Sequence, residues 1–264
     1  MYTKLSVRQA SVITRRSILT SATFISRVTQ FTASRIGGVF PILPAPITIR
    51  GWLDQDRLAR EVELLNRCRA HGMVWPPPDC RLSPDDRVKG AEIVMAAAKY
   101  PVILGVHGSD PGSTRRYARH AQKIGPRAVM AGLSGHLAES ARRLRSIANE
   151  CGLLLMAHVG SGVNIESVLR MRDQIDTLRL IEDSAAHTLS RISEYRRAAP
   201  ELTVFTNGHG RTLPDELERG AGGVTPPARL AEAYVRIWDH CLSGRRDQSI
   251  TELSQLQLSR AESA

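Results

Sequence analysis

The stretch Leu178-Arg179-Leu180-Ile181-Glu182-Asp183-Ser184 decides the fold prediction. Apolar residues lead into a carboxylate pair and then into small residues, which is typical of a short buried strand that ends before a helix. In a barrel of parallel strands the catalytic side chains lie at the C-terminal ends of the strands, and Glu182 is expected there. The pattern predicts a parallel α/β protein with an acid at its functional edge.

The same strand-then-helix unit repeats eight times from about residue 36. We expect strands at 38–41, 73–75, 102–105, 128–131, 153–156, 178–181, 203–205 and 222–225. We expect helices at 54–69, 84–99, 113–123, 136–150, 165–173, 188–197, 213–219 and 227–241, and a last one from 247. Such alternation means parallel pairing through right-handed crossovers, and eight units predict an α/β fold of the (β/α)8 TIM barrel type. An open doubly wound sheet is the alternative, weakened because no G-x-G-x-x-G run follows the first strand.

Composition and charge divide the chain into three segments. Residues 1–35 form a targeting or disordered leader, 36–243 the barrel, and 244–264 a shortened C-terminal helix and tail. The formal charge is +10, but six basic residues and no acid fall in the leader, so the remainder is close to +4. That value is ordinary for a protein of this size, and we predict no nucleic-acid partner. A hydrophobic content of 42% with only 5% aromatics suits an α/β protein.

The leader carries a possible export signal. Thr14-Arg15-Arg16-Ser17-Ile18-Leu19 resembles a twin-arginine leader, although the apolar run is short and Arg27 interrupts it. An organellar transit peptide and a disordered basic tail have similar compositions, so these readings stay open. The first implies a bacterial protein exported to the periplasm, and otherwise we expect a cytoplasmic one. No other stretch is long and apolar enough to span a membrane, and we predict no membrane partner.

The four cysteines, Cys68, Cys80, Cys151 and Cys241, are scattered without a C-x-x-C pair. This excludes a zinc framework or a disulfide scaffold as the organising feature. Cys80 could be a nucleophile, but with no histidine adjacent in sequence we favour an inert thiol.

With the units laid out, the chain resembles the dihydrodipicolinate synthase/N-acetylneuraminate lyase family. The matching segments occur in the family's order and cover about residues 36–257. They are Gly38 to Pro46 for the opening strand, Val102 to Val106 for the third strand, Tyr117 to Ala121 for the following helix, Leu178 to Ser184 for the sixth strand and Gly220 to Val224 for the eighth. Val74-Trp75-Pro76 and the leader bring the chain closest to a subgroup that also has a twin-arginine leader.

The resemblance implies a carbon–carbon lyase lineage. Members of this family form a Schiff base between a sixth-strand lysine and a 2-keto acid such as pyruvate, which requires a free amine. The resemblance therefore implies a small carboxylate or keto acid as the partner. We expect no cofactor, and we leave a homo-oligomer open.

The chain departs from the family at each catalytic position. Glu182 stands at the imine lysine, and the lysines of the chain are Lys4, Lys89, Lys99 and Lys123, which lie in the leader or on helix-like segments. The segment 157–162, with His158, replaces the family's Y-N-V-P-G-R-T. The segment 77–81, with Asp79, replaces its G-T-T-G-E loop. Standard Schiff-base activity is therefore not expected.

The barrel mouth is predicted to gather His107, His158, Glu182 and His209. Glu182 and His158 are the candidate catalytic pair for acid–base chemistry, since imidazoles and a carboxylate converge there. They could also bind a divalent metal, but no H-x-H or H-E-x-x-H spacing supports one. We favour hydrogen-bonded loop histidines and predict no metal. Glu182 as a general base competes with a structural ion pair to an arginine such as Arg211, which we favour.

The loop Asn207-Gly208-His209-Gly210-Arg211-Thr212 looks suited to an anion. Its glycines allow close approach of backbone N–H groups, and Arg211 can bind a carboxylate at a helix start. The candidate substrate-binding residues are Arg211, Asn207, His209 and Asp79. A simple helix-capping turn is the alternative. Two hypotheses follow: an enzyme whose mechanism has moved to Glu182 and the mouth histidines, or a non-catalytic carboxylate-binding or degenerate barrel.

Overall fold

The computed structural model describes residues 36–261 except 79, 134–135, 186–187 and 208–211. The predicted leader, residues 1–35, lies outside this part of the chain. The division into leader, barrel and tail stays a prediction.

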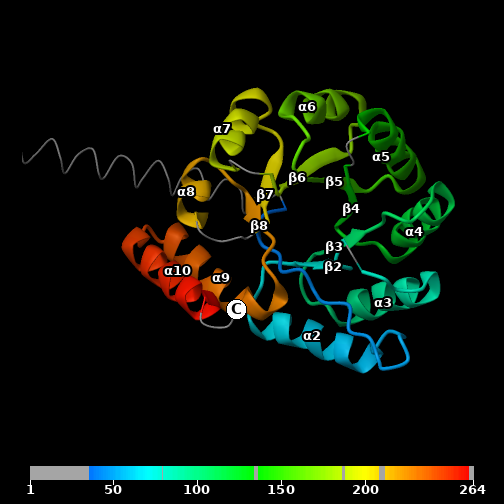
Figure 1. Ribbon diagram of the computed structural model, residues 1–264, viewed down its shortest axis with the longest axis horizontal. Helices are drawn as coiled ribbons and strands as arrows, with labels where there is room; N and C mark the ends of the chain where they lie inside the picture. The colour runs from blue at the N-terminus through cyan, green and yellow to red at the C-terminus, as the bar shows by residue number, and fades with distance from the viewer. Residues whose placement is uncertain (1–35, 79, 134–135, 186–187, 208–211, 262–264) are drawn as a thin grey trace, which may run out of the picture.

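Eight parallel strands form one sheet, and the helices surround it (Figure 1). The strands are β1 (Gly38–Val39), β2 (Met73–Trp75), β3 (Val102–Gly105), β4 (Ala128–Gly132), β5 (Leu154–Val159), β6 (Leu178–Asp183), β7 (Thr203–Thr206) and β8 (Gly223–Val224). Consecutive strands from β2 to β8 are neighbours, and β8 pairs with β1. Between β1 and β2, Leu43 N donates to Val74 O and Val74 N donates to Pro41 O, both at 2.9 Å. These bonds join the two edges of the sheet, and the strands form the predicted (β/α)8 barrel.

The helices alternate with the strands as the sequence pattern predicts. They are α2 (Gln55–Arg67), α3 (Pro84–Ala97), α4 (Pro111–Ile124), α5 (Leu137–Cys151), α6 (Ile165–Gln174), α7 (Thr188–Ala198), α8 (Leu213–Glu218), α9 (Ala231–Leu242) and α10 (Arg246–Ala261). Side chains of Asp54, Ser83, Asp110 and Asn164 accept backbone N–H groups at four of their N-termini. The helix expected at 227–241 starts later, because a 3-10 turn at Ala228–Leu230 precedes α9.

Two apolar layers hold the barrel together. Inside the barrel, side chains of alternate strand residues pack around the rings of Phe40 and Phe205. The centroids of these two rings are 5.4 Å apart, and the rings meet edge to face. Outside it, the other face of each strand packs against the helices, with Trp75, Tyr195 and Tyr234 fully buried. Each strand is therefore buried on both faces, which accounts for its nearly continuous apolar run.

The small residue at Gly223 is required by this packing. A Cβ atom at this position would overlap the Phe205 ring, which is fully buried against Phe40. We expect Gly223→Ala to lower the free energy of unfolding by about 1–3 kcal/mol, the cost of overpacking a filled core. Urea denaturation measures this loss. The matched control is Gly160→Ala, where an added Cβ would meet no atom within 4 Å and a change well below 1 kcal/mol is expected.

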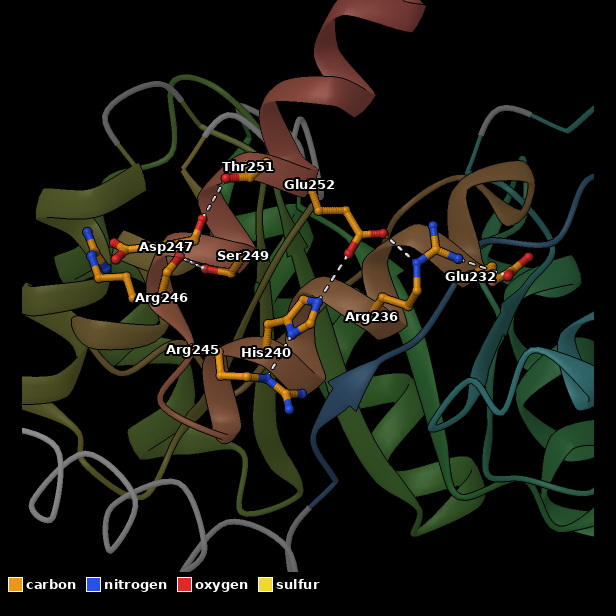
Figure 2. Close-up of polar contacts among 9 residues, drawn as sticks. All are labelled: Glu232, Arg236, His240, Arg245, Arg246, Asp247, Ser249, Thr251 and Glu252. Carbon is orange, nitrogen blue, oxygen red and sulfur yellow. Dashed lines mark hydrogen bonds and ion pairs between the residues drawn. The ribbon is translucent and has the colours of Figure 1, made fainter.

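The helix α10 is attached to α9 by a polar network (Figure 2). Arg236 pairs with Glu252 and with Glu232, the latter at 2.8 Å. His240 accepts from Arg245 at 3.0 Å through Nδ1 and lies 3.5 Å from Glu252 through Nε2. Because Arg236 and Glu232 are largely exposed, each pair contributes less than about 1 kcal/mol, and the network mainly fixes the orientation of α10. Among the described helices, none has the length and apolar character needed to cross a membrane.

Candidate functional site

His158 and Glu182 meet because they are register partners on adjacent strands. The β5–β6 pairing sets His158 opposite Glu182 and Val159 opposite Asp183. Alternation along each strand places His158 on the face of Met156 and Glu182 on the face of Leu180, and both of those residues belong to the barrel interior. The pair therefore lies on the inner face at the C-terminal end of the barrel.

The placement of His158 differs from the sequence prediction. We expected the fifth strand to end at 156 and His158 to lie in the following loop, but β5 extends to Val159. The added residues pair with β6, which itself runs on to Asp183. His158 is a strand residue with a fixed direction, and the expectation of a loop histidine was wrong for this position.

Glu182 is buried, and both of its carboxylate oxygens are hydrogen-bonded. Its exposed fraction is 1%, its Oε2 is 2.5 Å from His158 Nδ1, and its Oε1 accepts from Thr225 Oγ1 at 2.5 Å. A buried carboxylate is tolerated only with such partners. Thr225, the residue after β8, was not among the predicted site residues. Only its place at a strand end could have suggested it.

The predicted ion pair between Glu182 and Arg211 stays a prediction, because Arg211 lies outside the described residues. Among the described residues, a buried ion pair in this region is made by the neighbouring carboxylate. Asp183 accepts from Arg191 Nε at 2.8 Å and from Ala185 N at 2.9 Å on the outer side of β6. The two adjacent acids thus have separate environments: Asp183 faces α7, and Glu182 faces the barrel interior.

The hydrogen bond that His158 donates to Glu182 raises the pKa of the imidazole above its ordinary value, against the opposing effect of burial. The imidazole side chain is 27% exposed, so it borders both the buried carboxylate and the mouth. Its Nδ1 is engaged by Glu182, which leaves Nε2 as the atom able to exchange a proton with a bound molecule. This is the arrangement of an oriented acid–base histidine.

His107 lies at the mouth in a fixed tautomer. Its Nε2 donates to the carbonyl of Pro78 at 2.8 Å, so the neutral ring carries its proton on that nitrogen. Burial lowers its pKa, and the positive charges of Arg87, His158 and Arg143 contribute in the same direction. The pKa of His107 is thus lowered and that of His158 raised, which suits the two histidines to different roles in one site.

The loop after β7 is held at its two ends by one buried carboxylate. Glu216 of α8 accepts from Thr206 Oγ1 at 2.8 Å and from Thr212 Oγ1 at 2.9 Å. Asn207 follows β7 and is partly buried. His209 and Arg211, and Asp79 of the other predicted substrate loop, lie outside the described residues. Their assignment as substrate ligands stays a prediction.

Within the described part of the chain, no group of three or more His, Cys, Asp or Glu side chains is arranged to hold a metal ion. The mouth chemistry that the structure describes is that of two histidines and one carboxylate. These groups can move protons and bind polar groups.

Comparison with known proteins identifies relatives of this chain. No protein-family model matches the chain. The chain is 27% identical over 232 residues to the 4-hydroxy-tetrahydrodipicolinate synthase of Methanothrix thermoacetophila, covering 83% of this chain and 77% of that protein. It is 25% identical over 214 residues to the enzyme of the same name from Rhizobium meliloti, covering 74% and 71%.

Solved structures agree on the fold. The E. coli K12 protein YagE, a member of the dihydrodipicolinic acid synthase family solved in complex with pyruvate, superposes with a TM-score of 0.76 at 19% identity, covering 84% of this chain and 80% of YagE. At that identity the likeness concerns the fold alone. Together with the curated relatives, the barrel architecture and the order of its strand motifs, it leads to one assignment. The chain belongs to the dihydrodipicolinate synthase/N-acetylneuraminate lyase family.

Proposed function

We propose that this protein is an acid–base enzyme acting on a small 2-keto acid, in which the Glu182–His158 pair replaces the imine-forming lysine of the family. One observation carries the proposal. A buried carboxylate at the C-terminal end of β6 is hydrogen-bonded at 2.5 Å to an imidazole that borders the mouth. Such a pair is the usual means of orienting a general base and stabilising its protonated form.

The positions of the lysines support the loss of the Schiff-base step. Of the lysines in the described part of the chain, Lys89 lies on α3, Lys99 follows α3 and Lys123 lies on α4, and all three are exposed. An imine-forming lysine needs a buried site that lowers its pKa and a position at the strand ends. These lysines meet neither condition, and the sixth strand carries Glu182 where the family motif carries its lysine.

The reaction we assign to the pair is abstraction of a proton next to a carbonyl. Nε2 of neutral His158 takes a proton from the carbon adjacent to the keto group, and the C–H electron pair moves into a carbon–carbon double bond as the carbonyl becomes an enolate. The proton remains on the imidazole, where Glu182 stabilises the resulting cation. Return of a proton from Nε2 restores the keto acid, so the cycle is balanced and needs no cofactor.

Charge near the mouth supports an anionic substrate. Arg143 lies close enough to His107 to lower its pKa, whereas Glu182 is buried and fully hydrogen-bonded. We propose that Arg211 and Asn207, with His209 and Asp79, complete the carboxylate subsite. The complex of YagE with pyruvate makes pyruvate the first substrate to test. For residues 1–35 we propose export by a twin-arginine-like leader.

The test uses pyruvate in D2O. We expect the purified protein to exchange the methyl protons of pyruvate for deuterium, observed by NMR as loss of the methyl signal. Borohydride added to the same mixture should leave the protein mass unchanged, because reduction traps only an imine formed on an amine. An adduct mapped by peptide analysis to Lys89, Lys99 or Lys123 would show that Schiff-base chemistry persists, and the proposal would be wrong.

The same experiment distinguishes the non-catalytic alternative. Binding of pyruvate in calorimetry, together with an exchange rate equal to that of protein-free buffer, would indicate a carboxylate-binding barrel without activity. Exchange above the buffer rate that requires His158 would exclude it.

A further inference from the structure

A small cavity lies outside the barrel wall, between β2, β3, α3 and α4. Its volume is about 20 Å³, enough for one small occupant. The residues that matter for its chemistry are Trp75, Arg87, Tyr117 and His120, and the remaining lining is largely apolar. The site is separate from the Glu182–His158 pair, which lies on β5 and β6.

Two of the residues that line this cavity carry a buried donor with no hydrogen-bond partner. They are the Nε–H of Arg87 and the indole Nε1–H of Trp75. Arg87 is 8% exposed and Trp75 is fully buried. More than nine in ten buried polar groups in native proteins are hydrogen-bonded, because an unpaired buried donor is destabilising. Two such donors beside one cavity indicate an occupant that accepts hydrogen bonds.

A positive charge lines the cavity, and no described carboxylate lies in an ion pair with it. The Arg87 guanidinium donates through Nη2 to the carbonyl of Gly105 at 2.9 Å and lies 4.6 Å from the centre of the Tyr117 ring. Besides burial, which lowers the pKa of Arg87, the described groups that act on this pKa are Cys80 and Tyr117, and neither is a carboxylate. The nearby Glu92 pairs with Lys89 and His120 instead.

The buried charge and the two unpaired donors together favour an anion over water. A water molecule could accept from both donors, but it would leave the buried guanidinium without a counter-charge, which is costly in an apolar setting. A monatomic anion accepts both hydrogen bonds and neutralises the charge in the same small volume. We propose that this cavity is a halide site, with chloride held by Arg87 and Trp75. It lies behind the end of β3, whose next residues lead to His107 at the mouth.

The direct test is diffraction from crystals of the full chain soaked in bromide. We expect an anomalous peak in the cavity beside Arg87 Nε and Trp75 Nε1. In solution, the melting temperature should rise with sodium chloride or bromide along a saturable curve, and not with sodium gluconate at equal ionic strength. A cavity that refines as water with no anomalous signal would overturn the proposal.

Variants separate the site from a general salt effect. Trp75→Phe removes one donor and should weaken the apparent halide affinity about tenfold or more, the loss of a hydrogen bond to a charged partner. Arg87→Met should abolish saturable binding if it folds, and the wild-type diffraction test stands if it does not. The control is Arg115→Met on the exposed face of α4, which should change nothing.

One further variant tests an internal counter-ion. Asp79 lies outside the described residues, close in sequence to Cys80, and its carboxylate is the competing way to neutralise Arg87. If Asp79 has that role, wild-type protein shows no halide peak and Asp79→Asn creates one, which would overturn the proposal. Equal halide binding by both proteins supports it.

Discussion

Replacing Glu182 with glutamine is expected to slow the deuterium exchange of the pyruvate methyl group by roughly 10²–10⁴-fold, the usual contribution of an acid–base group. The amide keeps the size of the side chain and its bond to Thr225, but it cannot stabilise a proton on His158. The effect should fall on the rate of the chemical step, because Glu182 is buried and acts through the imidazole. NMR exchange at saturating pyruvate measures it.

The pH profile gives the same prediction a second signature. A general base works in its neutral form, so the rate should rise with pH through the pKa of His158 and level off above it. The hydrogen bond from the imidazole to Glu182 raises this pKa. In Glu182→Gln that contribution is lost, so the midpoint should move to lower pH while the plateau falls. A merely structural role for Glu182 would lower the rate without moving the midpoint.

The control for this variant is Glu166→Gln on α6, whose carboxylate forms an exposed pair with Arg170. It should leave both the rate and the midpoint unchanged. If Glu182→Gln retains the wild-type rate, the catalytic assignment of the pair is wrong.

The sequence predicts the barrel well because its signals are local. The apolar run at Leu178–Ile181, with a carboxylate at its end, contains most of the information needed to place a strand and the direction of Glu182. Capping residues such as Asp54 and Ser83 likewise mark helix starts without reference to the rest of the chain.

The site is less predictable because its contacts are long-range. Glu182 and Thr225 are 43 positions apart, and only closure of the sheet around the barrel brings the two side chains together. The extension of β5 to Val159 also depends on pairing with β6, since Ala157-His158-Val159 before Gly160 resembles the start of a loop. Asp183 pairs with a described arginine because α7 places Arg191 beside it, and the sequence around the two acids does not show this.

The second large effect concerns this buried ion pair. We expect Arg191→Met to lower the free energy of unfolding by about 3–5 kcal/mol, the cost of leaving one member of a buried pair without its partner. The Asp183 side chain is fully buried and Arg191 is 15% exposed, so water cannot readily replace the guanidinium. The remaining hydrogen bond from Ala185 N does not neutralise the carboxylate. Urea denaturation measures the loss.

Two further variants show whether the charge is the cause. Arg170→Met removes an arginine whose pair with Glu166 is exposed, and it should cost less than about 1 kcal/mol. Adding Asp183→Asn to Arg191→Met removes the stranded charge, so the double variant should be more stable than Arg191→Met alone. If it is not, the loss comes from the packing of the arginine stem near Tyr195, and the ion pair does not hold β6 in place. Recovery of stability would mean that the pairing of Asp183 with α7 keeps the end of β6 fixed, and with it the direction in which Glu182 faces His158.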